Sequence, residues 1–277
     1  MSAGYRQVSS NRSSNRPSKR TRQAVPRKTL AASIVSSVVT GFGFAAAIVS
    51  VPCALAVIAV RRLSGFAAWT DRAAKATARA IPATFGIATR VTGLRRLPEA
   101  GEGAEAGPII IMANHVNIFD GFLLRGGLPI AFRALELDRH FAWPVYGTAM
   151  RLYGNIPIPH GSPRAALTSL RRATRVLAEG TPLVVLPEGH RTRDGRLQRF
   201  MLGPFRLARE AGATIVPVYL HGAFERQQTG SLLVRPGTVY LRIGEPIPAH
   251  VVSSLDERSL RDHVRTHFER MAPSLAP

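Results

Sequence analysis

Five short apolar runs, separated by segments with helical patterning, make up much of the sequence from residue 108 onward. Each run has the length and apolar content of a buried strand. They lie at residues 108–113, 156–158, 183–186, 214–220 and 238–243. Because alternating strands and helices build sheets whose strands are mostly parallel, the sequence predicts an α/β fold with a mixed, largely parallel sheet covered by helices.

Two local features of this region make sharper predictions. Ser254 and Glu257 have the spacing of a capping box, so the last helix is expected to begin at Ser254. Pro217 interrupts the run 214–220 and has no backbone N–H to donate. We therefore expect its position to be an edge or a bulge of the sheet.

The first 60 residues have a different composition. Residues 1–28 hold eight Lys or Arg and no acidic residue, and they are rich in Ser, Asn and Gln, which predicts a disordered basic tail. Residues 29–60 contain no charged residue, and this run is longer than the roughly 20 residues that cross a bilayer as one helix. We expect a membrane-associated helical segment here, either a single tilted span or a re-entrant hairpin. A buried core hairpin is the weaker alternative.

Residues 63–90 favour a helix with Trp69 and other apolar side chains on one face and cations such as Lys75 on the other. Such a helix suits the headgroup plane of a membrane, but it equally suits the surface of its own domain, and both readings stay open. The expected division of the chain is a basic tail (1–28), a membrane-associated hairpin with an interfacial helix (29–91) and an α/β domain (92–277).

The charge balance restricts the class of partner. The chain has 37 Lys and Arg against 17 Asp and Glu, a net charge of +20, which favours an anionic partner such as nucleic acid, a membrane surface or an acidic substrate. Nucleic-acid binding predicts aromatic side chains beside the cations for base stacking. The basic tail has only Tyr5, so no nucleic-acid partner is expected. The single cysteine, Cys53, excludes an internal disulfide framework.

The first candidate site is the segment Asn114–Asp120, which directly follows the apolar run 108–113. Functional residues of α/β sheets gather at the carboxyl ends of strands. A spacing of five residues, across a loop and the start of a helix, can bring the carboxylate of Asp120 onto the ring of His115. A histidine held in this way by a carboxylate is a competent general base.

The second candidate is the segment 186–195, which follows the run 183–186. Gly189 permits a tight turn, and Arg191 and Arg193 carry planar guanidinium groups suited to phosphate. Glu188 is placed to orient one of these arginines. Taken by itself, the segment is more typical of a solvated turn with arginines on its rim.

Two further segments complete an ordered set of four blocks. Residues 153–161 (Tyr-Gly-Asn-Ile-Pro-Ile-Pro-His-Gly) place a glycine turn before a short strand, and residues 215–219 (Ile-Val-Pro-Val-Tyr) form another buried strand. In this order and spacing, the four blocks resemble those of the glycerolipid acyltransferase family, whose best-known members acylate lysophosphatidate. The resemblance covers about residues 92–245.

The resemblance implies a membrane-bound enzyme that moves an acyl group to the free hydroxyl of a lysophospholipid, most directly 1-acyl-glycerol-3-phosphate. The donor would be a thioester of coenzyme A or acyl carrier protein, with no bound cofactor and no metal. His115 would act as general base, with Asp120 holding its ring. The residues implied in binding the acceptor are Asn114, Gly154, Asn155, His160, Arg164, Glu188, Gly189 and Arg191.

The sequence departs from the family's pattern in three places. His160 stands where the second block usually has Arg, His190 replaces a Thr of the third block, and Met201 and Leu202 replace one or two Lys. All three departures lie on the side expected for the acceptor. Glycerol 3-phosphate or a lyso-aminolipid therefore stays open as the acceptor, and a non-catalytic lipid-binding scaffold is the remaining alternative.

The substrates and the charge distribution also predict a location. Acyl-CoA and acyl carrier protein are cytosolic, and the basic tail favours a cytosolic N-terminus. A re-entrant hairpin keeps the tail and the α/β domain on one side, whereas a single span separates them. We therefore expect a monotopic enzyme on the cytoplasmic face of the inner or plasma membrane, with its catalytic domain in the cytosol and in contact with membrane lipids.

Overall fold

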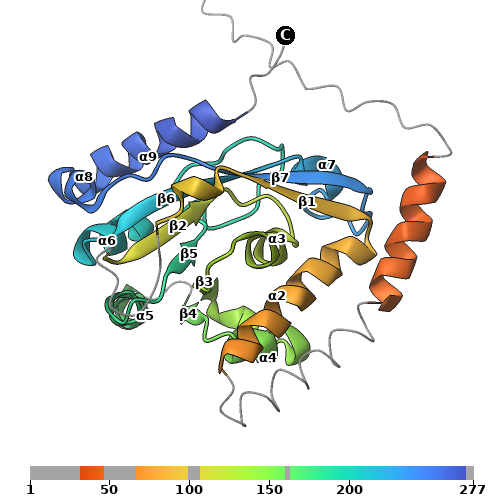
Figure 1. Cartoon of the computed structure of the whole chain (residues 1–277), viewed down its shortest axis with the longest axis horizontal. Helices are drawn as coiled ribbons and strands as arrows, with labels where there is room; N and C mark the ends of the chain where they lie inside the picture. The colour runs from red at the N-terminus through yellow and green to blue at the C-terminus, as the bar shows by residue number, and fades with distance from the viewer. Residues whose placement is uncertain (1–31, 47–66, 99–106, 160–162, 273–277) are drawn as a thin grey trace, which may run out of the picture.

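A seven-stranded sheet runs through the described part of the chain, which comprises residues 32–46, 67–98, 107–159 and 163–272 of the computed structural model (Figure 1). The strand order is β1-β7-β6-β2-β5-β3-β4. The strands are β1 (Ile87–Thr92), β2 (Ile109–Ala113), β3 (Arg133–Leu137), β4 (Ile156–Ile158), β5 (Leu183–Val185), β6 (Thr214–His221) and β7 (Gly237–Ile243). Only the pairing of β6 with β7 is antiparallel among these strands, which confirms the mixed, largely parallel sheet.

Helices cover both faces of this sheet (Figure 1). One face is covered by α2 (Ala67–Thr84) and α3 (Asp120–Gly127), and the other by α5 (Pro163–Ala178), α6 (Gly203–Glu210) and α9 (Glu257–Met271). The shorter elements are α4 (Pro144–Leu152), α7 (Ala223–Arg226), α8 (Ala249–Ser254) and the 3-10 turns η1 (Leu94–Arg96) and η2 (Asp138–Ala142). A further helix spans residues 32–46.

Strand β2 shows how the two cores arise from one apolar run. Ile109, Ile111 and Ala113 belong to the core under α2 and α3, whereas Ile110 and Met112 belong to the core under α5, α6 and α9. Successive side chains of a strand point to opposite faces. A run that is apolar at every position is therefore buried on both faces, as expected for a central parallel strand.

All five predicted strands are present, each within one residue of its expected bounds. The sequence pattern missed β1 and β3, because neither is a purely apolar run. β1 is an edge strand with Arg90 exposed, and β3 is half-buried throughout and carries Arg133 and Glu136. The sheet thus begins upstream of residue 92, the expected start of the α/β domain.

Pro217 does not lie at an edge of the sheet, but the bulge that was the other expectation is present beside it. Pro217 lies in β6, between β2 and β7, in register with Met112. Its carbonyl accepts a hydrogen bond from Gly244 on the β7 side, and the β6–β7 ladder begins only at the next pair, Val218 with Ile243. Antiparallel pairing resumes on the other side of Pro217, at Ile215 with Ile247, and the segment after β7 has one residue more between the two pairs than β6 has. The missing N–H therefore falls at this bulge, so a proline fits inside a central strand.

The predicted capping box was also wrong. Asp256 caps α9, since its carboxylate accepts hydrogen bonds from the backbone N–H groups of Arg258 (2.8 Å) and Ser259 (2.9 Å). Ser254 instead ends α8. Asp and Ser are about equally good N-caps, so residue type alone does not favour Ser254 over Asp256, two residues later.

Helix α2 packs on its own domain. Ala74, Ala78 and Ile81 form its buried stripe, at most 6% exposed, and α2 lies against α3. The Arg79 guanidinium donates a hydrogen bond to the carbonyl of Gly126 at 2.7 Å. Of the two open readings for residues 63–90, the described part agrees with a helix packed on its own domain.

The helix at residues 32–46 docks against this same side of the domain. The rings of Phe44 and Phe85 meet edge to face, with centroids 5.2 Å apart. The Thr40 hydroxyl accepts from the backbone N–H of Val234 at 2.8 Å and lies 3.2 Å from its carbonyl oxygen. This part of the predicted membrane segment is therefore attached to the α/β domain by specific contacts.

The rest of that N-terminal expectation is not covered by the structure. The basic tail 1–28 and residues 47–60 lie outside the described residues. Among the helices that are described, none combines the length and the apolar character needed to cross a membrane.

We expect Phe268→Ala to destabilise the protein by about 3–5 kcal/mol, because truncating a fully buried aromatic ring leaves a cavity. Phe268 is 0% exposed, and its ring lies edge to face with Phe200 at 5.3 Å. Urea unfolding followed by circular dichroism measures the loss. Leu232→Ala is the matched control, since Leu232 is 75% exposed and its truncation should change stability by less than about 0.5 kcal/mol. Equal effects of the two substitutions would contradict the assigned core.

Candidate active site

Three loops meet at one edge of the sheet. β2 lies beside β5, β5 lies beside β3, and all three strands are parallel. The carboxyl ends of neighbouring parallel strands share an edge, and this is where α/β proteins place their ligands. The segments after β2, β5 and β3, which hold both candidate segments of the sequence analysis, are thereby brought together.

The predicted pairing of His115 with Asp120 is present. His115 Nδ1 lies 2.8 Å from Asp120 Oδ2, with the histidine side chain 23% exposed and the carboxylate 1% exposed. A carboxylate on Nδ1 sets the tautomer and orientation of the imidazole and leaves Nε2 for a substrate. The pair thus has the geometry of an oriented proton acceptor at the sheet edge.

Asp120 is itself held by the turn that begins α3. Its carboxylate accepts hydrogen bonds from the backbone N–H groups of Val116 (2.6 Å) and Asn117 (3.0 Å). The Asn117 side chain, 1% exposed, accepts from the N–H of Phe119 and donates to the carbonyl of Ala223. The four intervening residues of the His-x4-Asp motif are therefore folded around the carboxylate, which explains the spacing.

Glu188 has a different role from the expected one. It is 1% exposed, and rather than orienting an arginine it accepts two backbone N–H groups. Oε1 lies 2.7 Å from the nitrogen of His115, and Oε2 lies 2.6 Å from the nitrogen of Gln198. Burial raises the pKa of Glu188 above its ordinary value, against the opposing effect of these two donors. Glu188 thus acts as a structural clamp on the backbone of His115, and each of its carboxylate oxygens accepts a hydrogen bond from the protein backbone.

The same loop also holds the other backbone group of His115. The N–H of Thr192 donates to the His115 carbonyl at 2.9 Å. Thr192 is 3% exposed, and its hydroxyl bonds to Asp194 and to Gln198. Sequence reasoning missed Asn117, Thr192 and Gln198, because nothing in their local pattern indicates which distant backbone groups they reach.

Two asparagines predicted to bind the acceptor are likewise occupied. Asn114 is 6% exposed and bonds both ways with the backbone of Leu220, tying β2 to the end of β6. Asn155 is 5% exposed, accepts from the N–H of Ala134 and contacts Met150. Both amides thus make contacts within the protein, and the prediction that these residues bind the acceptor stays a prediction.

The two predicted glycines adopt backbone conformations that favour glycine. Gly189 has φ 71°, and a Cβ there would collide with the side chain of Met201. Gly154 has φ 70°, and its Cβ would lie 3.1 Å from Arg133 Nε. Both glycines are required for turns at the sheet edge.

The cations of the predicted site differ in their placement. Arg191 is half-buried and Arg193 is exposed. Within the described residues, Arg191 makes no hydrogen bond or ion pair. Arg164 lies in the first turn of α5 with its side chain outside the described part, and His160 lies outside it altogether. Arg191 is therefore the predicted phosphate ligand that the structure places at the edge.

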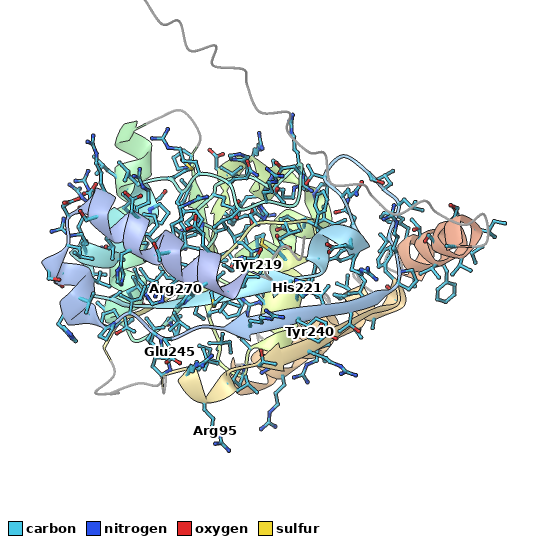
Figure 2. The ribbon with its side chains drawn as sticks, turned by 90° about the horizontal axis from the view of Figure 1, so that it is seen from above. Arg95, Tyr219, His221, Tyr240, Glu245 and Arg270 are labelled. Atoms are coloured by element: carbon cyan, nitrogen blue, oxygen red, sulfur yellow. The ribbon has the colours of Figure 1, made fainter. Side chains whose placement is uncertain are left out.

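Strand β6 adds two aromatic side chains. His221 ends the strand, and its ring centroid lies 6.0 Å from that of Tyr240 on β7 (Figure 2). Tyr219 is 8% exposed, and burial raises the pKa of its hydroxyl.

The described residues contain no group of three His, Cys, Asp or Glu side chains placed to hold a metal ion.

The family model described as Acyltransferase matches residues 88–221 of this chain. That range contains the His115–Asp120 pair, Glu188 and Arg191. This segment, just under half of the chain, is thus similar to the acyltransferase family. The glycerolipid acyltransferase resemblance carried by the four sequence blocks is thereby confirmed.

Relatives of this chain include the chloroplastic 1-acyl-sn-glycerol-3-phosphate acyltransferase LPAT1 of Arabidopsis thaliana. It is 31% identical over 158 residues, which are 57% of this chain and 43% of that protein. The 1-acyl-sn-glycerol-3-phosphate acyltransferase of Pseudomonas aeruginosa is 27% identical over 180 residues, which are 63% of this chain and 66% of that protein. The chain spans about half the length of the plant relatives it matches.

A solved structure shares the fold. The crystal structure of the 1-acyl-sn-glycerophosphate (LPA) acyltransferase PlsC from Thermotoga maritima superposes with a TM-score of 0.73 at 21% identity. The match covers 86% of this chain and 95% of that one. The mixed α/β sheet with its helices is therefore the fold of that protein as well.

We expect Glu188→Gln to cost about 1–3 kcal/mol of stability, because an amide can accept only one of the two backbone N–H groups and leaves the other unpaired. It should also lower acyl transfer, since the backbone of His115 loses its anchor. Glu179→Gln, at the exposed end of α5, is the matched control and should change neither property. Unaltered unfolding and activity in Glu188→Gln would contradict the clamp.

Proposed function

We propose that this protein transfers a fatty acyl group from a thioester to the free hydroxyl of a lysophospholipid, most directly converting 1-acyl-glycerol-3-phosphate to phosphatidate. The observation that carries the proposal is the imidazole of His115, oriented by Asp120 at 2.8 Å and 23% exposed at the carboxyl edge of the sheet. The names of the plant and Pseudomonas relatives support the same acceptor.

The geometry supports direct transfer. His115 Nε2 takes the proton from the acceptor hydroxyl, and the oxygen attacks the carbonyl carbon of the thioester. The resulting tetrahedral centre collapses with loss of the C–S bond, and the proton passes to the departing thiolate. An oxygen ester and a free thiol are the products. Asp120 stays bonded to Nδ1 throughout and stabilises the imidazolium that forms.

The donor is a thioester of coenzyme A or acyl carrier protein, and the partners are lysophospholipid and membrane lipid. The departures at His160, His190 and Met201 keep two other acceptors within the proposal, glycerol 3-phosphate and a lyso-aminolipid. A non-catalytic lipid-binding scaffold is the competing function, and it predicts no transfer to any of these acceptors.

We also propose that the protein is monotopic on the cytoplasmic face of the membrane, with the catalytic domain in the cytosol. The helix at 32–46 supports this, because its outward side chains are large and apolar. The exposed fractions are 56% for Ile34, 54% for Val35, 65% for Val38 and 69% for Phe42. Large apolar side chains gathered on one exposed helix face are typical of a surface that meets lipid.

Replacing His115 with Ala tests the proposed base. Transfer from acyl-CoA to 1-acyl-glycerol-3-phosphate by the purified protein should fall by about 10²–10⁴-fold, the usual contribution of general-base catalysis. His263→Ala, an exposed histidine on α9, is the matched control and should keep full activity. Unchanged activity of His115→Ala would rule out the proposed base. If the unaltered protein acylates none of the proposed acceptors, the scaffold function is favoured.

Protease accessibility tests the proposed placement. In inverted membrane vesicles, the basic tail and the α/β domain should both be digested, because both face outward there. In right-side-out vesicles both should be protected. Digestion of the tail and the domain from opposite faces would contradict a monotopic arrangement and indicate a single span.

A further inference from the structure

A second histidine–carboxylate pair lies at the same sheet edge. His140 Nδ1 is 2.5 Å from Glu136 Oε1, and the Tyr146 hydroxyl donates to Glu136 Oε2 at 3.2 Å. Both carboxylate oxygens are therefore used, one by each ring. The imidazole of His140 is oriented through Nδ1, which leaves Nε2 as its remaining polar atom. The proton transfer by His115 makes no use of this pair.

The pair lies within a group of aromatic side chains. The His140 ring centroid lies 4.9 Å from that of Trp143 and 6.1 Å from that of Tyr146. A Cβ at Gly147 would collide with the backbone of Phe141, so α4 packs directly on the turn η2 that carries His140. Trp143 is 56% exposed, whereas Glu136, His140 and Tyr146 are half-buried. The bonds of the His140 and Tyr146 rings to Glu136 therefore hold the imidazole, and with it Nε2, in a defined place.

The position of this group relates it to the acceptor. Glu136 lies near the end of β3, and Arg191 lies in the loop after β5, the parallel neighbour of β3. The two segments therefore leave the sheet side by side. Arg191 is also near enough to Tyr146 to oppose the rise in the pKa of that hydroxyl, which burial causes.

Binding of a phosphate monoester at this edge would need a second cation besides Arg191. The side chains of Asn114, Asn155 and Glu188 are bonded to other groups of the protein. Of the residues predicted to bind the acceptor, only Arg191 is therefore placed at the edge with a guanidinium that makes no hydrogen bond or ion pair among the described residues. A phosphate monoester carries up to two negative charges at neutral pH. A single half-buried guanidinium balances only part of that charge.

We propose that His140 is the second cation of the acceptor site and that it binds the phosphate monoester of the lysolipid through Nε2–H, together with the guanidinium of Arg191. Glu136 is the positioning residue that fixes the ring and balances its charge. This assignment rests on the proposed function and names the group that selects a phosphate-bearing acceptor. Binding a phosphate here directs the lysolipid's free hydroxyl toward His115, two strands away at the same edge.

Steady-state kinetics with two acceptors tests the assignment. His140→Gln keeps a hydrogen bond to Glu136 but removes the cation, so the KM for 1-acyl-glycerol-3-phosphate should rise about tenfold, the equivalent of one lost charge-assisted contact. The kcat should change less than about twofold, because uniform binding is lost and the chemical step is not. With 1-acylglycerol, which has no phosphate, neither constant should change.

Three variants complete the series. Glu136→Gln should raise the same KM by a smaller factor, because the ring is then less well held. His140→Ala should match His140→Gln, and His263→Ala should have no effect. An unchanged KM in His140→Gln overturns the proposal. An equal rise for both acceptors also overturns it, because that result indicates a general structural role.

A binding measurement separates failure of this proposal from failure of the proposed function. In the His115→Ala protein labelled with ¹⁵N-histidine, titration with glycerol 3-phosphate should shift the Nε2 resonance of His140 in a saturable way. Glycerol at the same concentrations is the control and should cause no shift. This outcome does not require catalysis. If the Nε2 resonance of His140 does not shift on addition of glycerol 3-phosphate, the proposed phosphate site is overturned, even if the unaltered enzyme acylates lysophosphatidate.

Discussion

The active edge depends on one buried carboxylate. Glu188 accepts the backbone N–H of His115 with one oxygen and that of Gln198 with the other, which joins the loop after β2 to the loop after β5. A buried carboxylate is stable only when its oxygens are satisfied in this way. The loops therefore cannot move apart without exposing an unpaired charge. The position of the His115–Asp120 pair depends on this constraint.

The parallel arrangement of the central strands explains why the residues of the proposed site share this edge. β2, β5 and β3 are neighbours, and each ends at the same side of the sheet. One strand end supplies His115, the next supplies Glu188 and Arg191, and the third supplies Glu136 and His140. The proposed division between proton transfer and phosphate binding thus corresponds to two ends of a short row of strands.

Much of this could be predicted from local pattern. The five apolar strands and the pairing of His115 with Asp120 depend on short-range spacing, and the structure contains them. β1 and β3 could not be found, because an edge strand and a half-buried strand tolerate charged side chains such as Arg90 and Glu136. The structural contacts of Asn114, Asn155 and Glu188 could not be predicted for a related reason. Their polar groups reach backbone atoms from 21 to 106 residues away.

The sequence by itself determined the pairing of His115 with Asp120, since a His-x4-Asp spacing after a buried strand closes on itself through local hydrogen bonds. It also determined the class of fold, because apolar runs and helical stripes follow from local periodicity. Only the tertiary structure decided which polar side chains support the backbone and which remain for a ligand. That division depends on long-range contacts, and no local pattern of residue types contains them. His140 is the clearest case, because its proposed role follows from the neighbours of β3 and from nothing in its own sequence context.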